Sequence, residues 1–393
     1  MGKAGRLFLV SQNLSLFGSS IVGYAIIWHI TLETSSGVWM MFSAICALLP
    51  QMLISLFGGV LADRYNRKYL IMLADCFVAM VTLALAISFL LGFRRLELLL
   101  IVSVARSIGA GLQTPAVSAI FPQLVPEEKL TKVQGINQTL VAALMLLSPA
   151  AGGLLLSTVG IVWAFIVDVI TAALAVLVMS RIRVEKIPEV KDSQSMYKDI
   201  LAGIAYIYGN NRLRRIIICG LFGYLLITPA VMLRPLMIER AFGHEVWRLT
   251  ASEIVWSAAS VLGGIFVSLK GQFRDKTLTM AICISAFGVM FGLLGVAWNF
   301  LSFLAFMGIA GFFMPVIATA LTVYIQENAP SEVLGRVFSV THLISTGSML
   351  VAIMFFGPLA DVVKIESILL LCGALLVLVG VLYGLSEKGA KTA

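Results

Sequence analysis

The stretch from Thr277 to Gln326, 50 residues long, contains no aspartate, glutamate, lysine or arginine. A single helix of this length would extend about 75 Å at 1.5 Å per residue, whereas the hydrocarbon core of a bilayer is about 30 Å thick. The stretch must therefore turn back on itself, and Trp298 with Asn299 forms the expected hairpin. Because lipid cannot satisfy backbone polar groups, the stretch predicts two membrane-spanning helices.

The rest of the chain repeats this pattern, with 60% hydrophobic and only 12% charged residues. Its apolar runs are continuous, which excludes the alternating strands of a transmembrane barrel and predicts an all-α integral membrane protein with twelve transmembrane helices. The expected spans cover residues 7–30, 38–61, 69–91, 97–120, 133–157, 161–180, 214–236, 249–269, 277–297, 300–325, 335–357 and 366–385.

The basic residues are distributed unevenly. Most of the 28 lysines and arginines fall in the segments on the side of the two termini, so the positive-inside rule places both termini in the cytoplasm. The net charge of +8 is thus explained by topology, and no nucleic-acid partner is expected. The first apolar run is long and contains Gln12 and Asn13, which favours a span over a cleaved signal peptide.

A polar segment at 181–213 divides the spans six and six. It predicts an N-terminal six-helix half at 1–180, a cytoplasmic linker and a C-terminal six-helix half at 214–393, with Tyr197–Tyr208 as an amphipathic surface helix. Glycines and prolines recur at an offset of about 200 positions, which indicates a parallel repeat. The corresponding residues are Gly111, Pro115 and Gly135 with Gly311, Pro315 and Gly335, and Gly58–Gly59 with Gly263–Gly264.

The loop after the second span carries the sequence GVLADRYNRK at 59–68. Membrane topology accounts for its basic residues but not for Gly59 and Asp63. A carboxylate is favoured by about 0.3–1 kcal/mol at a helix N-terminus, so Asp63 is expected to face the start of the eleventh span. We expect the basic side chains of this loop, Arg64, Arg67 and Lys68, to pair with Glu127 or Glu128. We expect Asp63 to contact the helix start at Gly335 and Arg336. An ordinary basic inner loop is the alternative.

Two charges lie deep within predicted spans at similar depths, Arg106 in the fourth and Asp168 in the sixth. A charge there costs about 2.5–3.5 kcal/mol on insertion scales, so each needs a partner or water. We expect the two side chains to approach each other near a central cavity. Burial favours the neutral acid and a nearby arginine favours the carboxylate, so Asp168 is our first candidate for a proton carrier. A structural ion pair is the alternative.

Three further titratable residues lie within spans: Asp75, Glu253 and His342. Asp75 is a rival proton carrier, although we favour its being an extension of the charged loop network. His342 could titrate near neutral pH, but a lone histidine beside hydroxyl residues is more often structural.

One face of the first span is polar and aromatic, which suits an amphiphilic organic ligand. Ordinary helix packing is the alternative reading. The candidate cavity residues are Asn13, Phe17, Tyr24, Trp28, Gln113, Asn137 and Gln138.

The sequence contains no phosphate-binding loop, no hydrolase or protease motif and no Cys/His spacing typical of a metal site. Its five cysteines fall in five different spans without a CxxC pair. We therefore expect neither an enzyme nor a cofactor, and no metal.

Four segments together resemble the major facilitator superfamily, and within it the bacterial macrolide-efflux (Mef-type) proteins. They are GVLADRYNRK at 59–68, RSIG at 106–109 followed by TP at 114–115, LVPEEKLTK at 124–132 and LGRVFS at 334–339. Asn66 stands where the superfamily loop motif has its second glycine. The resemblance implies a gating role for Asp63 and Arg67 and a role in proton coupling for Arg106.

A further resemblance concerns the fifth span, where Pro149, Gly152 and Gly153 match the superfamily's antiporter motif while Leu144 and Ser148 replace its other glycines. The resemblance implies a major facilitator fold in the bacterial plasma membrane, and a monomer that exports a macrolide-like drug or metabolite in exchange for protons by alternating access. A proton symporter for nutrient uptake and a non-transporting receptor or scaffold are the alternatives.

Overall fold

The computed structural model of the chain describes residues 2–184, 196–271 and 275–392. Within these ranges, the structure does not describe every side chain. The side chains left out are those of residues 60, 63, 127, 128, 131, 196–200, 331, 332 and 387–392. Part of the predicted linker at 181–213 therefore lies outside the described residues, and the predicted domain boundaries stay a prediction.

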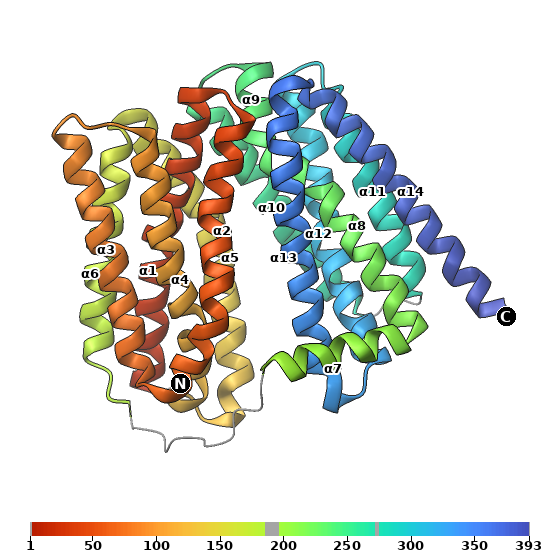
Figure 1. Ribbon diagram of the computed structural model, residues 1–393, viewed down its shortest axis with the longest axis horizontal. Helices are drawn as coiled ribbons and strands as arrows, with labels where there is room; N and C mark the ends of the chain where they lie inside the picture. Colours follow the sequence, from red (N-terminus) through yellow and green to blue (C-terminus); the bar gives the residue numbers. More distant parts are fainter. Residues whose placement is uncertain (1, 185–195, 272–274, 393) are drawn as a thin grey trace. The chain divides into compact units, whose positions relative to one another are not determined.

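All regular structure in the described part of the chain is helical (Figure 1). The helices are α1 (Lys3–Thr34), α2 (Gly37–Arg64), α3 (Arg67–Leu90), α4 (Leu96–Leu124), α5 (Glu127–Thr158), α6 (Ile161–Ser180), α7 (Met196–Gly209), α8 (Asn211–Met232), α9 (Arg234–Phe242), α10 (Val246–Lys270), α11 (Lys276–Leu294), α12 (Phe300–Asn328), α13 (Ser331–Val362) and α14 (Ile365–Thr392). Twelve of them, all except α7 and α9, are long and apolar enough to cross a membrane. The predicted fold class and the twelve spans are confirmed.

The hairpin predicted inside the charge-free stretch is also confirmed. α11 ends at Leu294, and α12 begins after Asn299. The Asn299 side chain accepts a hydrogen bond from the Ser302 backbone N–H, and the Ser302 hydroxyl reaches back to the Asn299 backbone. This reciprocal capping box satisfies two backbone groups that a helix start leaves open.

The chain divides into two compact units, and each is described by itself. The first consists of Met1–Ser35, Trp39–Lys191 and Glu245–Thr250. It holds α1 to α6 and has two separate apolar clusters. One gathers around Phe89 and Phe165 and includes the C-terminal part of α1. The other gathers around Phe8 and Phe121. The polar cavity described below is lined by residues of these helices, of which Ile26 also belongs to the cluster around Phe89 and Phe165.

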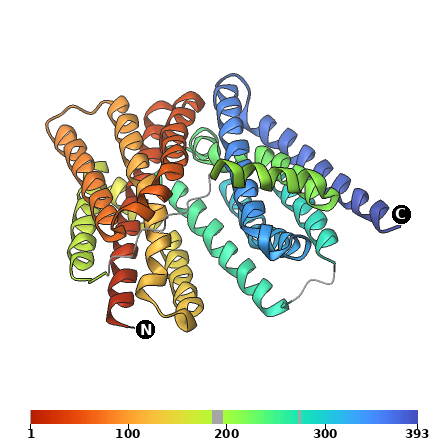
Figure 2. The same cartoon turned by 60° about the horizontal axis from the view of Figure 1, so that its bottom comes forward.

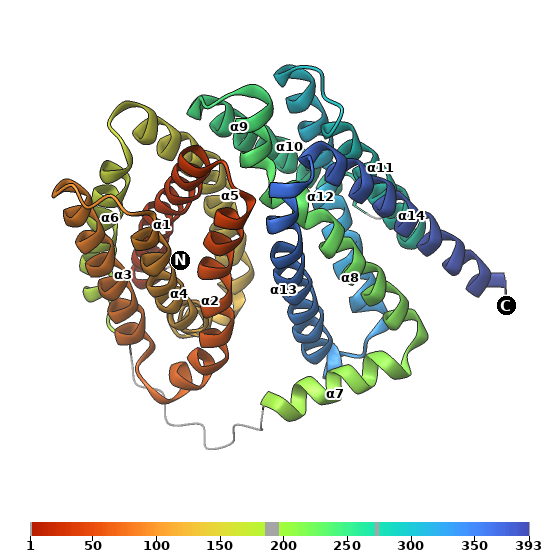
Figure 3. The same cartoon turned by 45° about the horizontal axis from the view of Figure 1, so that its top comes forward.

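The second unit consists of Ser36–Val38, Asp192–His244 and Ala251–Ala393. The helix predicted at Tyr197–Tyr208 is confirmed as α7, which crosses the ends of α8 and α13 (Figures 1 and 3) and appears in green across the end of this unit in Figure 2. Its residues Ile204 and Ile207 pack into the apolar cluster of this unit. The apolar face of α7 is thus covered in part by protein.

The short helix α9 was not expected from the sequence. Arg234, at its first position, forms a buried ion pair with Glu253 of α10. Because removing one partner of a buried pair leaves an uncompensated charge, this pair holds α9 against α10. Glu253, a candidate for proton coupling, therefore has a cationic partner.

The predicted repeat is visible in how small residues pack in each unit. A methyl group added at Gly111 of α4 would lie 2.9 Å from the Gln51 carbonyl oxygen of α2. One added at Gly311 of α12 would lie 2.9 Å from the Trp256 carbonyl oxygen of α10. Corresponding glycines therefore allow close helix contacts in both units, as small residues do in membrane proteins.

The neighbouring glycines of the loop motif differ in their packing. A methyl group added at Gly58 would lie 2.7 Å from the Gly111 carbonyl oxygen, whereas one added at Gly59 would meet no atom within 4 Å. Overpacking typically costs about 1–3 kcal/mol. We expect Gly58→Ala to lower the midpoint of thermal unfolding in detergent, followed by circular dichroism, relative to the matched control Gly59→Ala. Equal midpoints would contradict this account of the α2–α4 contact.

Candidate functional site

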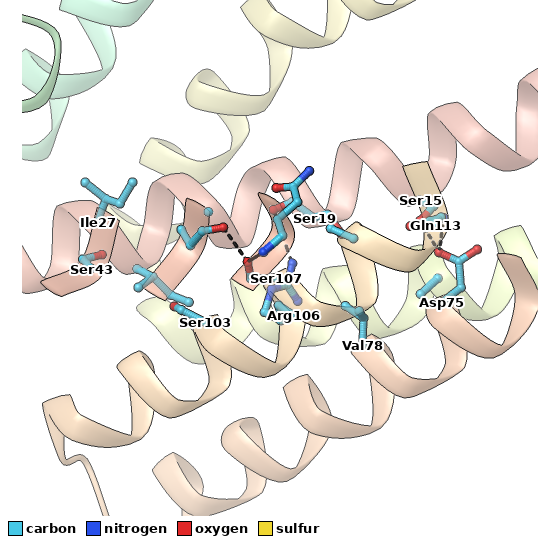
Figure 4. Close-up of a pocket in the computed structure, with 16 residues that line it drawn as sticks. Ser15, Ser19, Ile27, Ser43, Asp75, Val78, Ser103, Arg106, Ser107 and Gln113 are labelled. Atoms are coloured by element: carbon cyan, nitrogen blue, oxygen red, sulfur yellow. Dashed lines mark hydrogen bonds between the residues drawn. The ribbon is translucent and has the colours of Figure 1, made fainter. Parts of the chain in front are cut away.

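A polar cavity of about 200 Å³ lies inside the first unit, among α1, α2, α3, α4 and α6 (Figure 4). Besides apolar residues, its lining contains one acid, one base and several uncharged polar side chains. The polar lining residues are Ser15, Ser19, Ser43, Gln51, Asp75, Ser103, Arg106, Ser107 and Gln113. Since liquid water takes about 30 Å³ per molecule, the cavity has room for several waters.

Arg106 connects α4 with three other helices. Its guanidinium forms an ion pair with Asp168 of α6, donates to the Thr82 hydroxyl of α3 and reaches the Ser19 carbonyl oxygen of α1 at 3.4 Å. The Asp168 side chain is only 1% exposed. The expected approach of Arg106 and Asp168 is confirmed, while their role in proton coupling stays a prediction.

The position of Asp168 depends on a close approach of α1 and α6. A methyl group added at Gly18 would lie 2.9 Å from the Asp168 Cα and would also meet the Thr171 hydroxyl. With only hydrogen at this position, Ser19 comes near enough for its hydroxyl to donate to Asp168 Oδ1 at 3.4 Å. Both carboxylate oxygens of Asp168 therefore have a donor.

Asp75 lies in the same cavity but in a different environment. Its Oδ1 accepts hydrogen bonds from the Ser15 hydroxyl at 2.6 Å and from the Gln113 amide at 2.8 Å (Figure 4). Its Oδ2 is buried without a hydrogen-bond partner among the side chains that the structure describes. The favoured interpretation of Asp75 as an extension of the loop network is wrong, because its partners belong to the cavity.

Ser107 joins α4 to α2 beside Pro50. Its hydroxyl donates to the Ala47 carbonyl oxygen at 2.7 Å and accepts from the Gln51 N–H at 2.8 Å. In an uninterrupted helix these two backbone groups pair with each other. Pro50 has no N–H to donate to the preceding turn. The Ser107 hydroxyl therefore supports α2 at the point where the helix's own backbone hydrogen bonds are interrupted.

Around the loop motif, the described basic side chains contact backbone carbonyls of the first unit. Arg67 donates to Ala62 at 3.0 Å and to Ala119 at 2.9 Å. The Lys68 ammonium donates to the carbonyls of Ser180 and Ile182, both at 2.7 Å. These contacts hold the ends of α2, α4 and α6 around the start of α3.

Other members of the predicted gating set are placed only in part. Asn66, which replaces the motif glycine, caps α3 by accepting a hydrogen bond from the Lys68 backbone N–H. Arg64 is exposed. The side chains of Asp63 and Glu128 lie outside the described residues, as does that of Glu127. In the second unit, Gly335 is exposed and Arg336 is partly buried. The gating role of the whole set stays a prediction.

Most of the predicted ligand-binding residues do not lie at the cavity. Gln113 lines it, and the other six candidates do not. Those others are Asn13, Phe17, Tyr24, Trp28, Asn137 and Gln138. Trp28 is buried at 1% exposure and stacks at an angle with Tyr24. His342 is exposed on α13.

The antiporter-type motif of α5 packs on α1. A methyl group added at Gly152 would lie 3.5 Å from the Ile21 carbonyl oxygen. Pro149 lies inside the helix, and the preceding Ser148, which replaces a motif glycine, is fully buried. The motif therefore occupies a buried part of the first unit, and its directional meaning stays a prediction.

Sequence reasoning missed the hydroxyls that complete the site. Ser15 and Ser19 are four residues apart on α1, and so are Ser103 and Ser107 on α4. Residues at this spacing lie on one helix face, so pairs of serines within apolar spans could have indicated a polar face. Among the residues described, no cluster of three His, Cys, Asp or Glu side chains could hold a metal ion.

Known proteins resemble this chain over most of its length. The family model described as Major Facilitator Superfamily matches residues 8–352. Macrolide efflux protein A of Streptococcus pyogenes is 28% identical over 374 residues, 94% of this chain and 92% of that protein. Enterobactin exporter EntS of Shigella boydii serotype 4 is 25% identical over 392 residues, 96% of this chain and 91% of that protein.

The fold is also found among solved structures. A mutant of the nucleoside transporter NupG superposes with a TM-score of 0.75 at 12% identity, covering 96% of this chain and 98% of that one. At this identity the likeness concerns the fold and not the substrate.

Proposed function

We propose that this chain, which belongs to the Major Facilitator Superfamily, is an exporter. Its cargo is an amphiphilic small molecule, a macrolide-like drug or metabolite, which it exchanges for protons. The chain is a multi-pass membrane transporter and not an enzyme. It works by alternating access in the bacterial plasma membrane, as a monomer with both termini in the cytoplasm.

The observation that carries the proposal is the polar cavity in the first unit. Ionisable residues inside a membrane are costly and mark ion or proton pathways. Here Asp75 and Arg106 line one cavity, with Asp168 paired to Arg106 and Asp75 free of a cationic partner among its described contacts. A carboxyl group that can exist in either protonation state suits proton exchange.

Export, as opposed to uptake, is supported by two observations. Relatives of this chain over most of its length are named as a macrolide efflux protein and an enterobactin exporter. Pro149, Gly152 and Gly153 keep part of the antiporter-type motif, and Gly152 lies against α1. The names come from those proteins, and the substrate of this chain is part of the proposal.

The energy of one proton is sufficient for such an exchange. A charge moving through 100 mV gives about 2.3 kcal/mol, so a proton-motive force of about 150 mV gives about 3.5 kcal/mol. Since about 1.4 kcal/mol corresponds to a tenfold ratio, one proton per neutral molecule sustains a gradient of roughly 300-fold.

We expect cells that express this chain to accumulate less radiolabelled erythromycin than cells lacking it. A protonophore should raise accumulation to the level of the cells lacking it, because the driving gradient is then gone. Labelled enterobactin, measured in parallel, tests the alternative cargo. The matched control is Glu97→Gln, which changes an exposed acid at the start of α4.

Accumulation that stays low under the protonophore, with ATP depleted and sodium absent, would rule out proton coupling. Equal accumulation of both compounds with and without the chain would rule out both cargos.

A further inference from the structure

Asp75, which lines the cavity, and Asp168, which pairs with the lining residue Arg106, have opposite patterns of hydrogen bonding. Asp168 has donors on both oxygens, and one of the donors is the Arg106 guanidinium. Asp75 has two donors on Oδ1 and none described on Oδ2, and the residue is 3% exposed. The first pattern is that of an ionised carboxylate with its counterion.

The second pattern fits a neutral carboxylic acid better than a carboxylate. In the protonated form, one oxygen is a carbonyl with two lone pairs and the other is a hydroxyl. The Ser15 hydroxyl and the Gln113 amide occupy both lone pairs of Oδ1, which makes Oδ1 the carbonyl oxygen. An ionised Asp75 would instead hold negative charge on a buried Oδ2 with no described donor, which burial strongly disfavours.

The charges around Asp75 agree with this assignment. Of the charged groups on the helices packed on α3, Arg106 of α4 lines the cavity and Asp168 of α6 pairs with Arg106, while α1 contributes the uncharged Ser15. Arg106 is engaged by Asp168, Thr82 and the Ser19 carbonyl. Its charge is therefore already compensated within the ion pair, and no other cation lines the cavity among the described residues.

We propose that Asp75, held by Ser15 and Gln113, carries the exchanged proton on Oδ2, while Asp168 remains the ionised counterion of Arg106. This inference rests on the proposed proton-coupled function. In the exchange step the Oδ2–H bond breaks, its electron pair stays on the carboxylate and the proton passes to cavity water. Reprotonation on the other side of the membrane restores the neutral acid.

Infrared spectroscopy of the purified full-length protein tests the assignment without any substrate. A protonated carboxyl group gives a carbonyl stretching band that carboxylates lack. We expect this band at neutral pH in the wild type and its loss in Asp75→Asn. Its loss in Asp168→Asn with retention in Asp75→Asn, or its absence from the wild type, would overturn the proposal.

Two milder variants keep the test valid if Asp75→Asn does not fold. Gln113→Leu and Ser15→Ala each remove one donor to Oδ1, so the band should move to higher wavenumber. Ser103→Ala is the matched control, because Ser103 lines the same cavity but donates to the Leu99 carbonyl. A band unmoved by both cavity variants, or moved equally by the control, contradicts the assignment.

A second measurement separates this inference from the proposed function. Erythromycin added to weakly buffered, purified wild type should release protons, up to one per molecule, as followed by a pH-sensitive dye. Asp75→Asn should release none, and Glu97→Gln should behave as the wild type. Release from Asp75→Asn equal to that of the wild type overturns Asp75 as the carrier. A wild type without release contradicts the proposed exchange, whereas the infrared band still decides the state of Asp75.

Discussion

Arg106→Leu should abolish transport and lower the free energy of unfolding by about 3–5 kcal/mol, the range measured when one partner of a buried ion pair is removed. The substitution leaves Asp168, 1% exposed, without its cation. It also removes donors to the Thr82 hydroxyl and to the Ser19 carbonyl oxygen, so α1, α3 and α6 lose their common partner on α4.

The double variant Arg106→Leu/Asp168→Leu separates stability from function. An ion pair replaced by apolar residues is often neutral for stability, so the double variant should recover most of the lost unfolding temperature in detergent. It should still fail to export labelled erythromycin. A double variant as unstable as Arg106→Leu alone would show that Asp168 is not the group left unpaired, and a transporting one would remove the pair from the mechanism.

Asp63→Asn should abolish transport while expression and thermal unfolding stay close to those of the wild type. Asp63 lies at the C-terminal end of α2, where the helix dipole disfavours a carboxylate. Its charge therefore adds nothing to the stability of its own helix, and an amide of the same shape should be tolerated there. We expect transport to be lost because the conformational change of alternating access is impaired, since the loop motif is our predicted gate for that change.

The measurement is efflux from preloaded cells at matched expression, with Asn66→Gly as the control. That change restores the motif glycine and removes the cap of α3, so it should cost about 1 kcal/mol of stability at most and keep transport. Transport by Asp63→Asn at the wild-type rate would remove Asp63 from the gate.

The spans of this protein could be predicted because the bilayer imposes them. A helix must be long and apolar to cross, and α6 ends at the predicted residues Ile161 and Ser180. The approach of Arg106 and Asp168 could be predicted for a similar reason, since two opposite charges at equal depth in a bundle have few other partners. In both cases the cost of polar groups in lipid decides the outcome.

The rest of the site depends on helix rotation, which depth does not specify. Asp75 lies close to the loop motif along the sequence, but its side chain turns to Ser15 and Gln113 and not to the loop. The polar face expected on the first span also differs from the one observed at the cavity, where Ser15 and Ser19 lie. Neighbouring positions of a helix point about 100° apart around its axis, and mean hydropathy does not tell which of these faces meets the cavity.

The short helix α9 escaped prediction for another reason. Its nine residues, Arg234–Phe242, include charges and a proline. This composition predicts a polar loop. The buried pair of Arg234 with Glu253 holds it in place, and this contact joins residues on different helices. Local patterns carry no information about such a partner.

The bridge made by Ser107 bears on how sequences of this kind can diverge. Pro50 weakens α2 where Ser107 supports it, so the two positions should be inherited together. A lineage that first replaces Pro50 regains a backbone donor, and selection on the serine then relaxes. A lineage that first loses Ser107 leaves a weakened turn inside the membrane. Across descendants of such a chain, replacement of the proline should therefore precede loss of the hydroxyl.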